Sequence, residues 1–285
     1  MKRILYVTAF LFVTGTALTH SVKAFAADGE TENSLSTSLK EISSRIGNNI
    51  ASDYFTFYHG PTIKDMNSQY STDNTGHLNK RAVTGLDGEF NVDYMFDRAA
   101  GIGIGPTIPF IYSNIPEKGF MIGDVGIKTI DKKTIDTGNF RLYTSLYLQA
   151  PTSAYSQSLG MKYAVKTTPY VWYNIPNSRF KIGAWTEAKY YAQVLGDKDF
   201  KLYAAPYVNY RLSNKFALNL EYEMETHHPI GAPVTQFVGY QQDLQPGFIW
   251  FITEHMMVNP YLILMTNNIA TNTTGLGAVF SATLL

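Results

Sequence analysis

The sequence predicts a closed antiparallel β-barrel of about twelve strands, of the kind that spans a membrane. Three observations lead to this prediction: an export signal at the amino terminus, two-residue alternation through most of the chain, and connections that alternate in length. No stretch after the signal approaches the roughly 20 consecutive apolar residues that a spanning helix needs. A chain that meets lipid without such helices has to cross it with strands.

The first 26 residues have the pattern of a secretory signal peptide. Lys2 and Arg3 precede the uncharged apolar stretch 4–18, and the small-residue pattern Ala24-Phe25-Ala26 follows it. Cleavage after Ala26 would remove three of the 23 basic residues and leave 20 against 23 acidic ones, a net charge of −3. So weak a charge balance argues against nucleic acid as a partner.

The chain contains no cysteine. Disulfides, a lipid-modified cysteine anchor and a thiolate metal site are therefore excluded, and we expect neither a cofactor nor a metal.

Residues 27–50 form the next segment, and they carry the one helical pattern of the mature chain. Its apolar residues recur at spacings of three and four, which predicts an amphipathic helix over 35–50: Leu35, Leu39, Ile42, Ile46 and Ile50. We expect a periplasmic or interfacial lead-in to the barrel; the alternative is a plug inside the lumen.

From residue 51 to 285 the period is two. The segment 216–225 is the clearest, because Phe216, Leu218 and Leu220 alternate with Ala217, Asn219 and Glu221. About ten alternating residues between turns are typical of a membrane barrel strand. Twelve such segments can be counted, and ten is the alternative because the first and fourth alternate least well: 54–60, 84–96, 101–112, 122–135, 140–149, 163–174, 180–189, 200–209, 216–225, 241–252, 257–266 and 275–285.

The connections between these segments alternate in length. Long ones follow odd-numbered segments, as at 64–80, 151–160 and 226–240, and short ones follow even-numbered segments, as at 97–100 and 213–215. Barrels of the outer membrane have long external loops and short periplasmic turns. The pattern predicts an outer-membrane protein of a Gram-negative-type cell with both termini in the periplasm. A soluble β-sandwich is the alternative fold, but its strands are usually shorter.

Export to the outer membrane implies partners. We expect outer-membrane lipid, periplasmic chaperones and the barrel-assembly machinery, together with an unidentified small solute. The alternation of the last segment resembles the terminal strand that this machinery recognises, although such strands usually end in an aromatic residue and this chain ends in Leu285.

Two short motifs resemble a known family. Ile122-Gly123-Asp124-Val125-Gly126-Ile127-Lys128 is followed by an apolar strand and then by Pro151-Thr152-Ser153. The order is similar to outer-membrane proteins of the "meta-pathway of phenol degradation" type, over about a third of the chain. The resemblance implies a barrel associated with the transport of small, often hydrophobic compounds, and it assigns no functional residue.

The polar faces of the strands should point into the lumen. Basic residues would then lie beside glutamates, giving a transverse field that selects solutes or, alternatively, ion pairs that close the lumen. Inward aromatic rings would suit a sugar or a ring-bearing solute, or they could simply fill the barrel. The candidate lumen-lining residues are Arg141, Lys166, Lys181, Glu187, Lys189, Lys201, Arg211, Glu221, Glu223, Glu225, Tyr143, Tyr147, Trp172, Trp185, Tyr203 and Tyr207.

These patterns favour a pore or channel for small solutes, hydrophobic or aromatic compounds among them, over a structural or adhesive barrel with a filled lumen. A lipid-modifying enzyme is the third hypothesis, resting on His227 and His228, but no serine stands in a recognisable motif and we expect no catalysis. A metal site at His227, His228 and Glu225 is disfavoured too, because adjacent residues on a strand point to opposite faces. The carboxylates of Asp87, Glu89, Asp93 and Asp97 share one face of a strand; we expect them to be solvated in the lumen, and the alternative is that they bind a cation or the amine of a lipid.

Overall fold

A computed structural model describes residues 49–63, 85–113, 119–266 and 269–284 of the 285-residue chain. The signal peptide and residues 35–48 of the predicted helix lie outside these residues. Ile50, the last residue of that predicted helix, opens the first strand instead. Within the described part of the chain, no helix is both long and apolar enough to cross a membrane.

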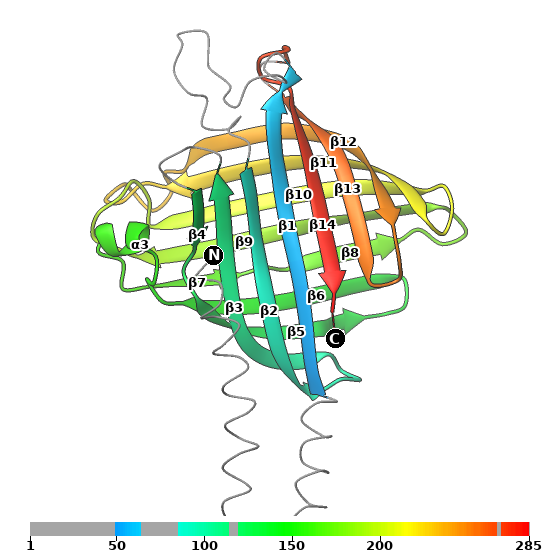
Figure 1. Ribbon diagram of the computed structural model, residues 1–285, viewed down its shortest axis with the longest axis horizontal. Helices are drawn as coiled ribbons and strands as arrows, with labels where there is room; N and C mark the ends of the chain where they lie inside the picture. The colour runs from blue at the N-terminus through cyan, green and yellow to red at the C-terminus, as the bar shows by residue number, and fades with distance from the viewer. Residues whose placement is uncertain (1–48, 64–84, 114–118, 267–268, 285) are drawn as a thin grey trace, which may run out of the picture. The chain divides into compact units, whose positions relative to one another are not determined.

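The described residues form one closed antiparallel barrel of twelve strands (Figure 1). Strand β14 pairs with β1, so that the ring has no free edge, and Asp53 lies opposite Thr283 in this closing pair. The segments are β1 (Ile50–Thr62), β2 (Gly85–Asp97), β3 (Ile102–Ser113), β4 (Gly119–Ile122), β5 (Gly126–Asp136), β6 (Phe140–Gln149), α3 (Ala154–Ser158), β7 (Tyr163–Thr167), β8 (Tyr170–Asn174), β9 (Phe180–Ala192), β10 (Phe200–Arg211), β11 (Phe216–His228), β12 (Val238–Phe251), β13 (Met256–Met265) and β14 (Gly275–Thr283).

Two of the twelve strands are each interrupted once. β4 and β5 both pair with β3, and β7 and β8 both lie between β6 and β9. Pro169 explains the second interruption, because proline has no N–H to donate to a strand ladder. The carbonyl of Pro169 still accepts a bond from the Thr186 N–H at 2.9 Å, so the neighbouring strand stays in place. The predicted count of twelve is confirmed.

The side-chain distribution is the reverse of that in a soluble protein. The largest fully buried side chains are all polar: Lys128, Asn91, Thr107, Asp93 and Asp243. Large apolar side chains are exposed on the outer wall, with Leu146 at 51% and Leu148 at 56%. In a sandwich the apolar faces would meet in a shared core, so the sandwich alternative is wrong. A closed ring with this outer surface suits a hydrocarbon solvent, since every backbone group of the wall can bond within the wall.

Candidate functional site

The inner face of the barrel is identified by contacts that cross it. Lys128 on β5 lies 3.6 Å from Asp53 on β1, three strands away around the ring, which only side chains pointing inward can do. Antiparallel pairing places directly opposite residues on the same side, so the register carries this assignment from strand to strand. Lys128 is paired with Tyr147, Tyr147 with Lys166, and Lys166 with Lys189. By this pairing and the alternation along each strand, all sixteen candidate residues point inward.

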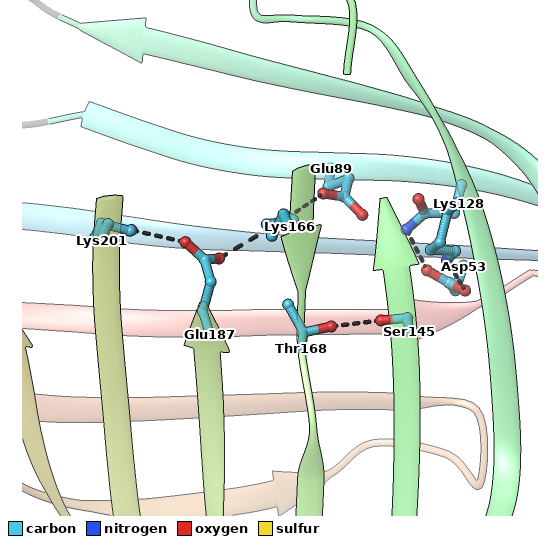
Figure 2. A network of polar contacts seen from close by, with 9 residues as sticks. Asp53, Glu89, Lys128, Ser145, Lys166, Thr168, Glu187 and Lys201 are labelled. Atoms are coloured by element: carbon cyan, nitrogen blue, oxygen red, sulfur yellow. Dashed lines mark hydrogen bonds and ion pairs between the residues drawn. The ribbon is translucent and has the colours of Figure 1, made fainter. Parts of the chain in front are cut away.

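Alternating charges form a ladder across the interior (Figure 2). It runs from Glu225 on β11 to Lys201 on β10 at 3.5 Å, and from Lys201 to Glu187 on β9 at 2.8 Å. Glu187 continues to Lys166 on β7 at 4.0 Å, and Lys166 to Glu89 on β2 at 3.5 Å. The last step leaves the wall, because β7 and β2 are four strands apart around the ring.

Lys128 neutralises a second group of carboxylates. Its ammonium lies 3.2 Å from Asp93 and 3.6 Å from Asp53, and the lysine side chain is only 2% exposed. Glu89 and Asp93 are buried, at 4% and 0% exposure. The expectation of solvated carboxylates is therefore wrong for Glu89 and Asp93, because the interior is packed where they lie, whereas Asp87 and Asp97 are exposed.

An aromatic stack joins opposite walls. The ring centroids of Phe57 on β1 and Trp185 on β9 are 6.1 Å apart, with an interplanar angle of 11°. These strands are six places apart in either direction around the ring, so the stack spans the full width of the barrel. Tyr203 meets Trp185 edge-on at 5.1 Å, and Phe55 meets Phe57 in the same way at 5.7 Å.

Glu223 on β11 is held by hydrogen bonds from the two neighbouring strands. Glu223 accepts hydrogen bonds from the Tyr203 hydroxyl and from Gln245 Nε2, the latter at 2.6 Å. Gln245 Nε2 also donates to Asp243 at 2.8 Å. Tyr203, Glu223, Gln245 and Asp243 are thus joined in one hydrogen-bonded group across β10, β11 and β12.

Three of the four remaining basic candidates lie toward the short-turn end, and the fourth, Lys189, lies beside Lys166 and Lys201. Arg141 pairs with Asp136 at 3.2 Å, and Arg211 Nε donates to the Ser213 carbonyl at 3.3 Å. The Lys181 ammonium lies 5.0 Å from the centre of the Trp172 ring. Of the six basic candidates, the structure thus brings Lys166 and Lys201 into contact with glutamates, and it does not do so for these three.

The segments 122–128 and 151–153 meet in space. The Asp124 carboxylate accepts bonds from the Ser153 N–H at 2.9 Å and from the Ser156 hydroxyl. Thr152 Oγ1 accepts from the Val125 N–H at 2.9 Å and donates to the Gly123 carbonyl at 3.2 Å. The two motifs together fix the break between β4 and β5 against the loop that carries α3.

The histidine pair lies at the end of β11 and has structural contacts. His228 Nδ1 is 2.7 Å from Asp199 Oδ1, and its Nε2 is 3.0 Å from the Pro233 carbonyl. Both ring nitrogens of His228 are thus engaged in contacts with the two loops next to this end of β11. No group of three possible metal-binding side chains occurs among the residues that the structure describes.

A groove of about 550 Å³ lies in the outer wall, away from the ladder. Its lining is almost entirely apolar and includes Val171, Ile182, Val208 and Leu220. These side chains alternate along their strands with side chains that point inward, so they lie on the outer surface of the barrel. Lipid chains would fill such a groove in a membrane.

Comparison with solved structures gives the fold. The barrel is similar to an outer membrane channel from Pseudomonas putida F1, with a TM-score of 0.53 and 16% sequence identity, over 82% of this chain and 95% of that one. This likeness shows the fold alone, a closed antiparallel β-barrel. The NanC porin matches with a TM-score of 0.45 and 8% identity, over 82% of this chain and 100% of that one. No protein-family model matches the sequence, and no curated protein does.

Proposed function

We propose that this protein is an outer-membrane pore for small solutes, with a constriction built from the charge ladder and the Phe57–Trp185 stack. The observation that carries the proposal is the closed ring with an apolar outer wall and a charged inner wall. Apolar side chains facing out match a bilayer, and charged side chains facing in match water. The fold shared with the channel from Pseudomonas putida F1 supports the same proposal.

The constriction sets the size of solute that such a pore admits. Three links cross the interior: the Phe57–Trp185 stack, the Lys166–Glu89 ion pair and the Lys128–Asp53 ion pair. Lys166 and Glu89 are only 12% and 5% exposed, so their ion pair and the packing around it narrow the pathway. The proposal therefore predicts a small conductance, well below that of a wide-open porin.

The solute class follows from the rings on the inner wall. Trp185, Tyr203 and Phe57 form one continuous aromatic surface at the constriction. Flat rings favour offset stacking and edge contacts with other rings. We infer that ring-bearing solutes pass here, in keeping with the resemblance to the phenol-degradation family, whose two motifs meet at Asp124.

The orientation and maturation of the protein are part of the same proposal. The signal peptide would be cut after Ala26, and both termini would lie in the periplasm because the short turns lie at that end. Outer-membrane lipid, periplasmic chaperones and the barrel-assembly machinery would be the partners during insertion. A cysteine introduced at Ser178, in a short turn, should react with a membrane-impermeant thiol reagent only when the outer membrane is permeabilised.

Single-channel recording of the purified mature protein in planar bilayers tests the proposal. Discrete conductance steps are expected for the unmodified protein, and their size should increase when Glu89→Gln breaks the ion pair across the interior. The control is Glu254→Gln, because Glu254 is exposed in a short turn. Silent bilayers with properly folded protein, in the parent and in the Glu89→Gln variant alike, would overturn it.

One observation favours a second candidate, a structural barrel with a filled lumen. Three links cross the interior, Phe57 to Trp185, Lys166 to Glu89, and Lys128 to Asp53, and they could close it completely. Under this hypothesis no conductance appears until several links are removed together. The recording that tests the pore thus separates the two candidates.

A further inference from the structure

We infer that Lys189 is the docking point for the carboxylate of an aromatic acid inside the barrel. The inference rests on the proposed function, because the site would lie on the path of the solute through the pore. Binding to the site can nevertheless be tested without measuring transport. Lys189 lies on β9 and points inward beside the charge ladder. It is not a rung of that ladder.

Three lysines stand side by side at this level. In the strand register Lys189 lies directly opposite Lys166 on β7 and directly opposite Lys201 on β10. Like charges placed directly opposite each other destabilise a sheet. A row of three ammonium groups therefore needs negative charge close to each of them.

Only the outer two lysines of this row have carboxylate partners. Lys201 contacts Glu187 and Glu225, and Lys166 contacts Glu89 and Glu187, all within 4.0 Å. Among the residues described by the structure, Lys189 has no carboxylate oxygen within that distance. The central ammonium is thus the one that an external anion can reach without displacing a glutamate.

Aromatic rings surround the same position. The Lys189 ammonium lies 4.9 Å from the centre of the Tyr191 ring, and Lys166 lies 3.9 Å from that of Tyr147. Lys201 lies 5.9 Å from that of Tyr203, which touches Trp185. A solute with a carboxylate and a ring can therefore bind an ammonium and stack on a ring at once. Chloride could use only the charge, and a neutral phenol only the rings.

Benzoate is the probe that matches this chemistry. Its binding to the detergent-purified protein can be followed by titration calorimetry, and its effect on single-channel current by recording. Lys189→Gln should weaken benzoate binding at least tenfold, which corresponds to ~1.4 kcal/mol. Lys189→Arg keeps the charge and should retain binding. Lys215→Gln removes a charge from a short turn and should change nothing.

The stability of the variants separates binding from a structural role. Because Lys189→Gln relieves repulsion in the lysine row, it should leave resistance to urea unchanged or raised. Equal benzoate affinity in the parent and in Lys189→Gln would overturn the inference, and so would equal affinity for benzoate and chloride in the parent protein. Binding with the expected variant pattern but without any conductance would overturn the pore and leave this site standing. Conductance without benzoate binding would leave the pore proposal standing and overturn the proposed site at Lys189.

Discussion

Phe57 and Trp185 stack face to face across the full width of the barrel, with ring centroids 6.1 Å apart. Their strands, β1 and β9, lie opposite each other in the ring of twelve. A contact between opposite walls means that the interior at this level has no room for a wide water column. The width of any pathway is therefore set by side chains and not by the number of strands alone.

Removing this stack should widen the pathway. Trp185→Ala deletes the larger ring, and we expect a severalfold increase in single-channel conductance of the purified protein. The control is Trp250→Ala, because Trp250 lies on the outer wall and stacks on Phe216 there. Unchanged conductance in Trp185→Ala would mean that the stack lies outside the ion path.

The buried ammonium of Lys128 should be essential for stability. Lys128→Met leaves Asp53 and Asp93 without their shared counter-charge in a packed interior. Breaking a buried ion pair from one side costs roughly 3–5 kcal/mol. Urea unfolding in detergent micelles, followed by the loss of barrel signal in circular dichroism, measures the cost.

Adding Asp93→Asn to Lys128→Met should recover part of that loss, because the double variant removes one of the stranded carboxylates. Lys215→Met, on an exposed turn, is the matched control and should unfold like the parent. A Lys128→Met protein as stable as the parent would show that water already solvates the two aspartates.

Much of the inner face could be predicted from the sequence, and the partners across it could not. Alternation with a period of two decides which residues share a face, so the pattern alone puts Lys166, Glu187 and Lys201 on the inner face. Which strand lies opposite which depends on the strand count and stagger of the closed ring. The sequence of neither strand therefore indicates that Lys166 contacts Glu89.

Two residues were missed for local reasons. Asp53 comes just before the first predicted segment, 54–60, whose alternation is weak because Phe55 and Phe57 point inward as well. Lys128 was noted only as part of the motif 122–128, and its burial follows from the approach of β1 and β2. The acidic residues Asp87, Glu89 and Asp93 on one strand were the available signal for Lys128. Carboxylates that are buried need cations close by, so this strand indicated that lysines face it.

The carboxylate of Asp124 should hold the loop that contains α3. Asp124→Ala removes the acceptor for the Ser153 N–H and the Ser156 hydroxyl. Hydrogen bonds to a charged group contribute roughly 1.5–3 kcal/mol each. We expect faster amide exchange and faster proteolysis at 150–162 with an intact barrel. The control Asp197→Ala, in a different loop, should leave this segment protected.

A charge on the outer wall should be costly because that wall faces hydrocarbon. Leu220 lies near the middle of β11, points outward and is 44% exposed. Arginine near the bilayer midplane costs a membrane barrel roughly 2–4 kcal/mol, so Leu220→Arg should lower the free energy of unfolding in lipid vesicles by about that amount. Ser178→Arg places the same side chain in an exposed turn and should have little effect. If both variants unfolded alike, the wall around Leu220 would face water, and a membrane-spanning barrel would be excluded.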